Sequence, residues 1–195
     1  LCNMVLPGCV KNNDAPGVAS LNIFNGIVGS DTLVANLKDG ATGTMQWFRT
    51  ANFVFYGKAG NPDYTSPRNN NQFNSYSGNQ RFTFFHYPDT LSHHTPVVDI
   101  ELNLPVGSMN SLFFTGTLHA PDTFFIRDQL PYHALTDSVT SIRVVNLLPG
   151  VTASVNLKGN APGSELSSLA YKTASAFKDY SVTGSGDLYE FEIRE

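Results

Sequence analysis

The sequence is poor in cysteine, in charge and in long apolar runs. Its two cysteines, Cys2 and Cys9, lie close together at the N-terminus, which excludes a disulfide framework and a cysteine-based zinc site in the rest of the chain. Charged residues make up 14% of the chain and the net charge is −4, so the sequence carries no electrostatic signature of nucleic-acid binding. No segment approaches the ~20 consecutive apolar residues of a membrane-spanning helix.

What the chain does have is apolar and aromatic residues, at 41% and 12% of its 195 residues, which is enough to fill a sizeable core. Glycine, asparagine, serine and threonine supply the polar share in place of charge. This mixture is typical of turn-rich, exported β proteins with an uncharged surface.

Short apolar segments alternate with turn signals from Val18 onward. The segment Val98–Leu104 shows the clearest strand alternation, with four apolar residues on one face, and no segment has a helical period. We therefore expect an all-β fold of antiparallel sandwiches, immunoglobulin-like or transthyretin-like. The expected strands are Ser20–Ile27, Thr32–Leu37, Met45–Arg49, Asn52–Gly57, Gln80–His86, Val97–Leu104, Ser111–Leu118, Thr123–Arg127, Ser141–Leu147, Ala153–Leu157, Leu166–Tyr171 and Leu188–Ile193. The expected turns are Asp39-Gly40, Pro105-Val106-Gly107, Pro149-Gly150 and Lys158-Gly159-Asn160.

An internal repeat organises the chain. Five blocks recur in the same order, and they predict a first sandwich at 18–130, a boundary within 129–140 and a second, partial sandwich at 141–195. The matched blocks are Ser20–Asn25 with Ser141–Asn146, Asn36–Lys38 with Asn156–Lys158, Val54–Tyr56 with Leu169–Tyr171, Phe73, Tyr76 and Ser77 with Phe177, Tyr180 and Ser181, and Phe82 and Phe84 with Tyr189 and Phe191.

The two copies are unequal. The first copy has a long polar loop, Gly60–Gln72, between its Tyr56 and Phe73 landmarks. The second copy stops where Glu195 aligns near Pro88, before any counterpart of Val97–Leu104 or Ser111–Leu118. Because a sandwich without these strands leaves a sheet edge unpaired, we expect this sequence to be a fragment, or its second copy to be completed by strands of the first copy or of a partner chain.

The N-terminal segment 1–17 is expected to be the remnant of a secretory signal followed by a polar tether. Leu6-Pro7-Gly8-Cys9 resembles the bacterial lipobox, although Pro7 stands where Ala, Ser or Thr is usual. The resemblance implies an outer-membrane lipoprotein of the Bacteroidetes type, anchored through lipid on Cys9 at the periplasmic or the cell-surface face. The alternative is that Cys9 is an ordinary residue of a disordered tail.

The second copy resembles the domain-of-unknown-function 4397 family. Ser141–Asn146, Pro149-Gly150, Ala153–Leu157 with its Lys158-Gly159-Asn160 turn, Leu169-Ala170-Tyr171 and the Phe177–Tyr180 segment carry the resemblance. Domains of this family are thought to be β-sandwiches of exported bacterial proteins, often in tandem and often on lipoproteins. The family has no catalytic residue to carry over, so the resemblance concerns fold and location.

Catalytic and metal signals are weak. The histidines His86, His93, His94, His119 and His133, with Asp89 and Asp99 nearby, are better explained as solvated loop residues than as ligands. The carboxylate pairs Asp99/Glu101 and Glu190/Glu192 share a strand face as glycosidase acids do, but alternation places them on a solvent face. We therefore expect no enzyme, no cofactor and no metal, with an envelope carbohydrate-active hydrolase or a carbohydrate-binding protein as the alternative.

One candidate ligand site emerges from the polar loop and its surroundings. Aromatic rings and side-chain amides are the groups that sugar sites use, although an asparagine-rich loop is also a common flexible insertion. The candidate residues are Trp47, Tyr64, Asn69, Asn70, Asn71 and Gln72. The resulting expectation is a non-catalytic binding or structural module whose partners are the membrane, through its lipid, and a polysaccharide or protein at the cell surface, with no nucleic acid.

Overall fold

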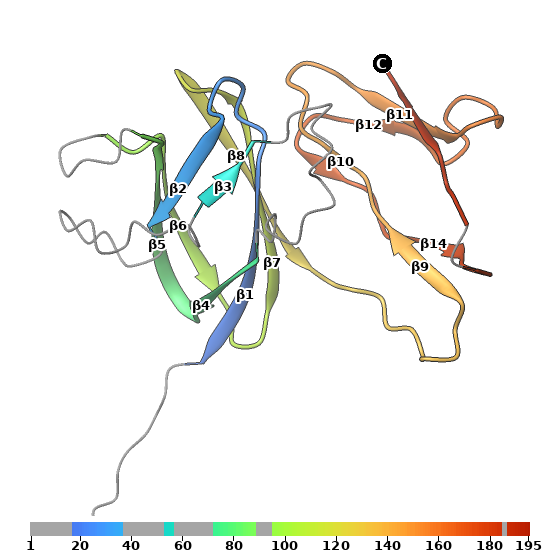
Figure 1. Cartoon of the computed structure of the whole chain (residues 1–195), viewed down its shortest axis with the longest axis horizontal. Helices are drawn as coiled ribbons and strands as arrows, with labels where there is room; N and C mark the ends of the chain where they lie inside the picture. The colour runs from blue at the N-terminus through green and yellow to red at the C-terminus, as the bar shows by residue number, and fades with distance from the viewer. Residues whose placement is uncertain (1–16, 37–52, 57–71, 89–94, 185–186) are drawn as a thin grey trace, which may run out of the picture.

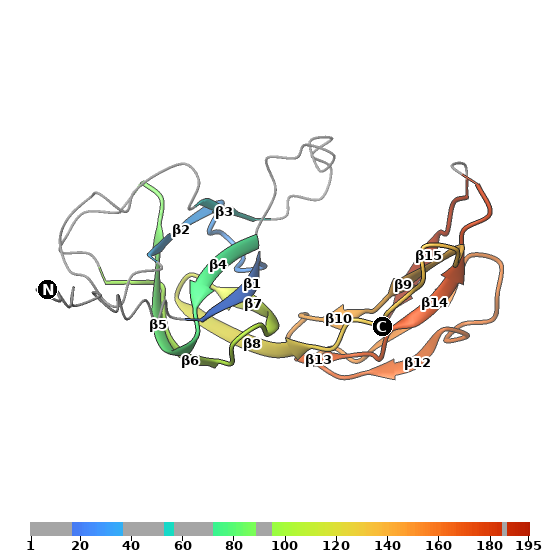
Figure 2. The same ribbon diagram turned by 90° about the horizontal axis from the view of Figure 1, so that it is seen from below.

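The computed structural model describes residues 17–36, 53–56, 72–88, 95–184 and 187–195. Every regular element in these ranges is a β-strand, which confirms the all-β class. Strands of residues 18–128, called the N-terminal half below, and strands of residues 139–195, called the C-terminal half, pair only within their own half. The two halves lie next to each other along the long axis of the molecule (Figures 1 and 2).

In the described ranges, the N-terminal half has the strands β1 Val18–Asn25, β2 Thr32–Asn36, β3 Phe53–Phe55, β4 Gln72–Tyr76, β5 Gly78–His86, β6 Val98–Leu104, β7 Met109–Thr117 and β8 Ala120–Asp128. They form two four-stranded sheets, with strand orders β4-β1-β7-β8 and β3-β2-β5-β6. The expectation of antiparallel sheets holds for each pair except β1 and β7, which run parallel from Ser20 opposite Met109 to Asn25 opposite Phe114.

The two sheets of the N-terminal half enclose one apolar core. Strand alternation fills it: Leu21 and Ile23 of β1 are fully buried, whereas Phe24, the residue after Ile23, is exposed. Phe84 of β5 and Phe114 of β7 meet edge to face across the two sheets, with ring centroids 4.6 Å apart. Aromatic pairs of this kind contribute about 0.5–1.5 kcal/mol beyond the area they bury.

In the described ranges, the C-terminal half has the strands β9 Val139–Ile142, β10 Val145–Asn146, β11 Ala153–Leu157, β12 Leu166–Leu169, β13 Thr173–Ala174, β14 Lys178–Ser181 and β15 Phe191–Arg194. They form the pairs β14-β9 and β10-β13 and the three-stranded sheet β12-β11-β15, all antiparallel.

Three strand pairs of the N-terminal half recur in the C-terminal half. Strand β9 pairs with β14 as β1 pairs with β4, and β11 lies between β12 and β15 as β2 lies between β3 and β5. In the pairing of β2 with β3, Leu33 lies opposite Val54, and in the pairing of β11 with β12, Ala153 lies opposite Leu169. These are the positions that the sequence comparison matched, so we interpret the two halves as related by one strand order.

Two buried asparagines make the same contacts in both halves. Asn25 and Asn146 each accept, through Oδ1, a hydrogen bond from the backbone N–H two residues further on, at 3.1 Å and 2.9 Å. Each also donates through Nδ2 to the matching carbonyl, Val54 O at 3.3 Å and Leu169 O at 2.9 Å. A side chain that satisfies a turn N–H and a strand carbonyl at once fixes the end of the first strand against the other sheet.

One alignment is wrong by two residues. Asn36 lies opposite Thr83 and Asn156 lies opposite Glu192. Phe82 therefore corresponds to Phe191, and Phe84 corresponds to Ile193, rather than to Tyr189 and Phe191. The error arises because side chains alternate with a period of two, so a shift of two residues preserves the apolar pattern.

Three of the expected turns are confirmed. Backbone hydrogen bonds close them from Ser108 N to Pro105 O, from Val151 N to Leu148 O and from Asn160 N to Leu157 O. Their glycines, Gly107, Gly150 and Gly159, have φ of 71°, 75° and 88°, a conformation in which other residues are strained. The turn expected at Asp39-Gly40 lies outside the described residues.

The strand expectations differ from the structure in two ways. The expected strand Ser141–Leu147 is interrupted between β9 and β10, where Val144 exchanges hydrogen bonds with Ser175. Strands β4, β13 and β14 were not expected, because they are short and polar, and β4 and β14 each bury one aromatic side chain, Phe73 and Tyr180. The expected strand Met45–Arg49 lies outside the described residues. In the described ranges, no helix has the length and apolarity needed to cross a membrane.

Candidate binding site at the junction of the two halves

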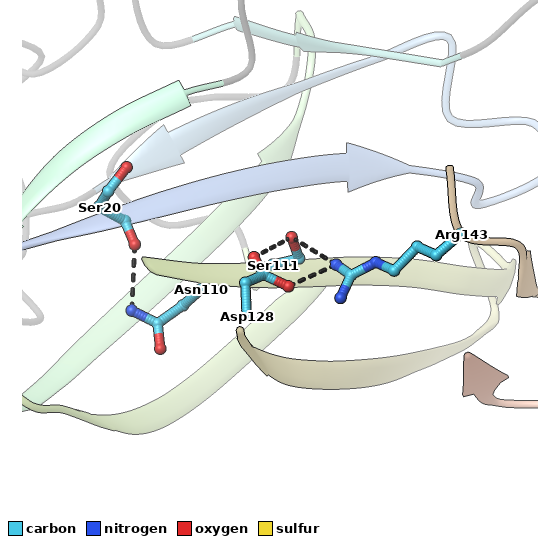
Figure 3. Close-up of polar contacts among 5 residues, drawn as sticks. All are labelled: Ser20, Asn110, Ser111, Asp128 and Arg143. Atoms are coloured by element: carbon cyan, nitrogen blue, oxygen red, sulfur yellow. Dashed lines mark hydrogen bonds and ion pairs between the residues drawn. The ribbon is translucent and has the colours of Figure 1, made fainter. Parts of the chain in front are cut away.

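A buried ion pair joins the two halves. Asp128 ends β8 with its side chain 3% exposed, and Arg143 follows β9 with its side chain 14% exposed. Arg143 donates through Nη2 to Asp128 Oδ1, and the Ser111 hydroxyl donates to Asp128 Oδ2 at 2.7 Å (Figure 3). Both carboxylate oxygens are thus hydrogen-bonded, which is the condition under which burial of an ion pair is tolerated.

Strand alternation explains why these groups meet outside the core. Leu112 points into the core of the N-terminal half, so its neighbour Ser111 points outward. Asp128 lies at the end of β8, next to β7, and its carboxylate reaches the same outer face. Arg143 comes from the break between β9 and β10, where the C-terminal half meets that face. A hydrogen bond of 3.3 Å from Arg143 Nη2 to Ser111 Oγ completes the cluster.

Arg143 also borders a pocket. Its guanidinium carbon lies 5.0 Å from the centroid of the Phe177 ring, within the range of cation–π contacts. The pocket has a volume of about 340 Å³, near the lower limit for small-molecule sites, and is lined by Arg127, Gln129, Pro131, Arg143, Ala176 and Phe177. The contacts with Asp128, Ser111 and Phe177 hold the guanidinium in place at the border of this pocket.

A second polar contact between the halves centres on Asp122 of β8. Lys172 Nζ donates to its Oδ1 at 2.8 Å, and the Tyr171 hydroxyl donates to its Oδ2 at 3.1 Å. The hydrogen bond from Lys172 lowers the pKa of Asp122 below its ordinary value, against the opposing effect of desolvation. Nearby, the Thr115 hydroxyl donates to the Leu147 carbonyl at 2.6 Å.

Asn110 lies on β7 next to the ion-pair cluster but faces the other side of the strand. Its side chain is fully buried, and Nδ2 donates to the Ser20 carbonyl at 3.0 Å (Figure 3) and to Ser108 Oγ at 2.8 Å. Its Oδ1 is buried and has no hydrogen-bond partner among the described residues. The donated bonds tie the beginning of β7 to the parallel strand β1.

Ser141, His133 and Asp179 form a cluster of catalytic residue types at the start of the C-terminal half. His133 Nε2 lies 2.5 Å from Ser141 Oγ, and the Ser141 hydroxyl donates to Asp179 Oδ1 at 2.6 Å. Asp179 Oδ1 lies 3.5 Å from that same Nε2. In a catalytic triad the carboxylate binds the opposite ring nitrogen, so that the imidazole can take the serine proton. Here the serine proton goes to the carboxylate, and the geometry favours a structural cluster.

Three of the four carboxylates identified in the sequence, Asp99, Glu190 and Glu192, take part in ion pairs. Arg81 donates to both oxygens of Asp99, at 2.7 Å and 2.5 Å, and this hydrogen bonding lowers the Asp99 pKa. Glu190 binds Lys158 at 2.8 Å. Glu192 accepts from Arg194 and from Asn156, each at 2.8 Å, which lowers the Glu192 pKa. Ionised carboxylates paired in this way are poor proton donors near neutral pH.

The structure describes His86, His119 and His133, whereas His93, His94 and Asp89 lie outside the described residues. Within the described ranges, no group of three or more histidine, cysteine, aspartate or glutamate side chains is arranged to hold a metal ion.

The structure places one of the six candidate ligand residues. Gln72 is the first residue of β4, opposite Asn22, and its Nε2 donates to Ser20 Oγ at 2.9 Å. The expected polar loop therefore ends before Gln72. The other candidates, Trp47, Tyr64, Asn69, Asn70 and Asn71, lie outside the described residues, as does the expected lipid-anchor residue Cys9.

Sequence reasoning missed the junction residues Asp128, Arg143 and Phe177 as a site. Arg143 and Phe177 served only as landmarks of the repeat. One signal was available. Arg143 is the single charged residue of the segment Ser141–Asn146, and the matching residue of the first copy is the uncharged Asn22. The partner Asp128 could not be assigned without the fold, because the contact crosses from one half to the other.

Comparisons with known proteins leave the chain without a family. No family model matches it, and no curated protein matches it. The resemblance to the domain-of-unknown-function 4397 family therefore stays a prediction based on residues 141–195.

Proposed function

We propose that this chain is an exported, lipid-anchored module of a Gram-negative cell envelope, with a non-catalytic binding or structural role. Export and lipid anchoring rest on the sequence Leu6-Pro7-Gly8-Cys9. The observation that carries the non-catalytic role is the pairing of the charged residues. Asp128 with Arg143 and Asp122 with Lys172 connect the two halves, and Asp99 with Arg81 connects neighbouring strands. Because these carboxylates are held in ion pairs between strands and between halves, they favour a structural role over acid–base catalysis.

Anchoring is tested by fractionation. The chain is expressed behind an export signal in a Gram-negative host and labelled with a palmitate analogue. We expect the parent chain to fractionate with membranes and to carry label, and Cys9→Ala to be released unlabelled. Cys2→Ala is the matched control, because it removes the other cysteine and keeps Leu6-Pro7-Gly8-Cys9. A labelled, membrane-bound Cys9→Ala protein would contradict the anchor.

The binding role is tested on polysaccharide and envelope-protein arrays with the chain lacking lipid. Retention of one defined ligand without turnover supports the proposal, whereas measured hydrolysis of any array component would contradict it.

A carbohydrate-binding role is the second candidate, because the junction pocket offers an aromatic ring and a fixed guanidinium to a sugar acid. Phe177→Ala should weaken retention of such a glycan by about tenfold if stacking supplies about 1.4 kcal/mol. Tyr76→Ala, which changes an exposed ring of β4 in the other half, is the control.

A further inference from the structure

The first strand of the N-terminal half is fixed at its start by two turns. The Ser77 N–H donates to the Gly17 carbonyl at 2.8 Å, and the Gly107 N–H donates to the Val18 carbonyl at 2.8 Å. The start of β1 therefore lies between the turn that joins β4 to β5 and the turn that joins β6 to β7. In Figure 1 this is the lower end of the molecule.

Exposed apolar side chains surround this point. Val18 begins β1, and Tyr76 of β4 lies opposite it. Met109 begins β7, the parallel neighbour of β1. Val106, in the turn after β6, lies so close to Gly17 that a Cβ on Gly17 would be 2.6 Å from Val106 Cγ2. The apolar end, as we call this cluster, consists of four side chains that are 48–72% exposed: Val18, Tyr76, Val106 and Met109.

The segments that form the apolar end contain no charged residue. Strands β1 and β4 and the segment 104–110 consist of apolar, hydroxyl, amide, glycine and proline residues. The carboxylate opposite Met109 belongs to Asp128, which is buried and paired with Arg143. Contact with an apolar phase therefore removes water from no exposed charge of these segments, and dehydration of charge is the main cost of such a contact.

A second set of exposed apolar residues lies on the same side of the molecule. The linker of residues 129–138, between β8 and β9, extends to the lower end in Figure 1. Leu130, Tyr132 and Leu135 of this linker are exposed. Hydrogen bonds between Ala134 and Asp137, each 2.9 Å long, hold its conformation. The lower end thus presents apolar side chains from the N-terminal half and from the linker.

We propose that this lower end lies against the surface of a phospholipid bilayer, an inference that depends on the proposed anchoring through Cys9. The covalent chain supports it, because the eight residues from Cys9 to Gly17 span at most about 29 Å. A bilayer that holds lipid on Cys9 is therefore within reach of the apolar end. Uncharged apolar and tyrosine side chains enter the boundary between headgroups and acyl chains, where tyrosine keeps its hydroxyl in water.

The test attaches one 14-carbon chain chemically to Cys9 of the full chain, with Cys2→Ser to make the attachment specific. Partition onto phosphatidylcholine vesicles is measured by sedimentation. One such chain binds a bilayer only weakly, with an association constant of about 10⁴ M⁻¹, so a protein contact changes the bound fraction measurably. We expect Val106→Asp to lower the partition constant about tenfold, because it removes one valine from apolar contact. Leu135→Asp should lower it as well, because that linker residue is exposed at the same end.

Val28→Asp is the matched control. Val28 is 59% exposed, follows the opposite end of β1 and pairs with Thr117 at the end of β7. The substitution should leave the partition constant unchanged, because this end of the strand faces away from the bilayer. Circular dichroism of each variant verifies that its fold is intact.

Equal partition of the parent, Val106→Asp and Leu135→Asp would overturn the inference, and so would an equal loss in Val28→Asp. Self-association of the parent without vesicles, abolished in Val106→Asp and accompanied by no gain in partition, would overturn it in favour of a second copy. Because the lipid is attached chemically, the result does not depend on whether a host lipidates Cys9. The inference and the proposed function therefore fail separately.

Discussion

The two halves share a strand order but bury their cores to different extents. In the N-terminal half, Leu21, Ile23 and Phe84 are inaccessible to solvent. In the C-terminal half, the matching Ile142 and Val144 are half-buried and Ile193 is mostly exposed, although Ala153 and Val155 remain buried. Full burial of these positions therefore accompanies the neighbouring strands β6 and β7, which the described C-terminal half lacks.

The side-chain hydrogen bonds at the matched turns are the same in both halves, despite this difference in burial. Asn25 and Asn146 make the same two side-chain contacts, with similar lengths, in a well-buried half and in an open half. This contact requires only one turn and one neighbouring strand. It is therefore present in the C-terminal half, although the core residues there are less buried.

The largest expected contrast lies at the matched positions Phe84 and Ile193. Phe84→Ala removes a fully buried ring that contacts Phe114, and should destabilise the chain by about 3–5 kcal/mol. Ile193→Ala removes a mostly exposed side chain and should change stability by less than about 1 kcal/mol. Urea denaturation followed by circular dichroism measures both. Comparable losses in the two variants would show that the C-terminal half has a closed core.

The two asparagines provide a contrast of intermediate size. Asn25→Ala and Asn146→Ala each remove a buried side chain that donates to a strand carbonyl and accepts from a turn N–H, and each should lower the free energy of unfolding by about 1–3 kcal/mol. Because the contacts match, the two losses should agree within about 1 kcal/mol. If Asn146→Ala did not lower the free energy of unfolding, the two asparagines would not have equivalent roles in the two halves.

High pH should weaken the C-terminal half selectively. Burial, together with its hydrogen bond to Glu165, raises the pKa of Tyr180 to about 12. A raised pKa means that the stabilisation is complete below the unfolded value of about 10 and is lost as the pH rises through 12. Near-ultraviolet melts between these values should show a loss that Tyr180→Phe removes. Tyr132→Phe, at an exposed ring, should leave the loss unchanged.

The smallest effect is expected at low pH, at the contact between the halves. The Lys172 hydrogen bond lowers the pKa of Asp122, so its contribution is present above the unfolded pKa and is lost as the pH falls through the lower, folded value. Both side chains are partly exposed, so the contribution is about 0.5 kcal/mol.

Lys172→Met should reduce the acid sensitivity of thermal unfolding below pH 4. Lys158→Met is the control, because it breaks an exposed ion pair, with Glu190, that lies within the C-terminal half and does not join the two halves. An equal response of the two variants would show that Asp122 does not couple the halves.

The sequence predicts the parts of this fold that rest on local patterns. Alternation in Val98–Leu104 and glycines at the turns located strands and turns correctly, because both signals act over a few residues. Strand β14 was missed because only Tyr180 in Lys178–Ser181 is buried, so the segment carries little apolar pattern. The parallel pairing of β1 with β7 was missed because it joins segments far apart in the sequence.

The candidate site was less predictable for the same reason. Asp128 and Arg143 come from different halves, and the sequence between them contains no motif that implies a contact. The repeat brought Arg143 and Phe177 to attention only as landmarks. Their contact depends on the break between β9 and β10, which is set by the hydrogen bonds of Val144 with Ser175.

Native-state hydrogen exchange at matched amides tests the central claim most directly. Amides of β1, β2 and β5 should exchange only through global unfolding, whereas amides of β9, β11 and β15 should exchange through local opening at lower free energy. The predicted result is a difference in exchange free energy between matched positions such as Leu21 and Ile142 that persists when global stability is varied with denaturant. Equal protection at the matched positions would contradict the account, because it would show that the C-terminal half is as closed as the N-terminal half.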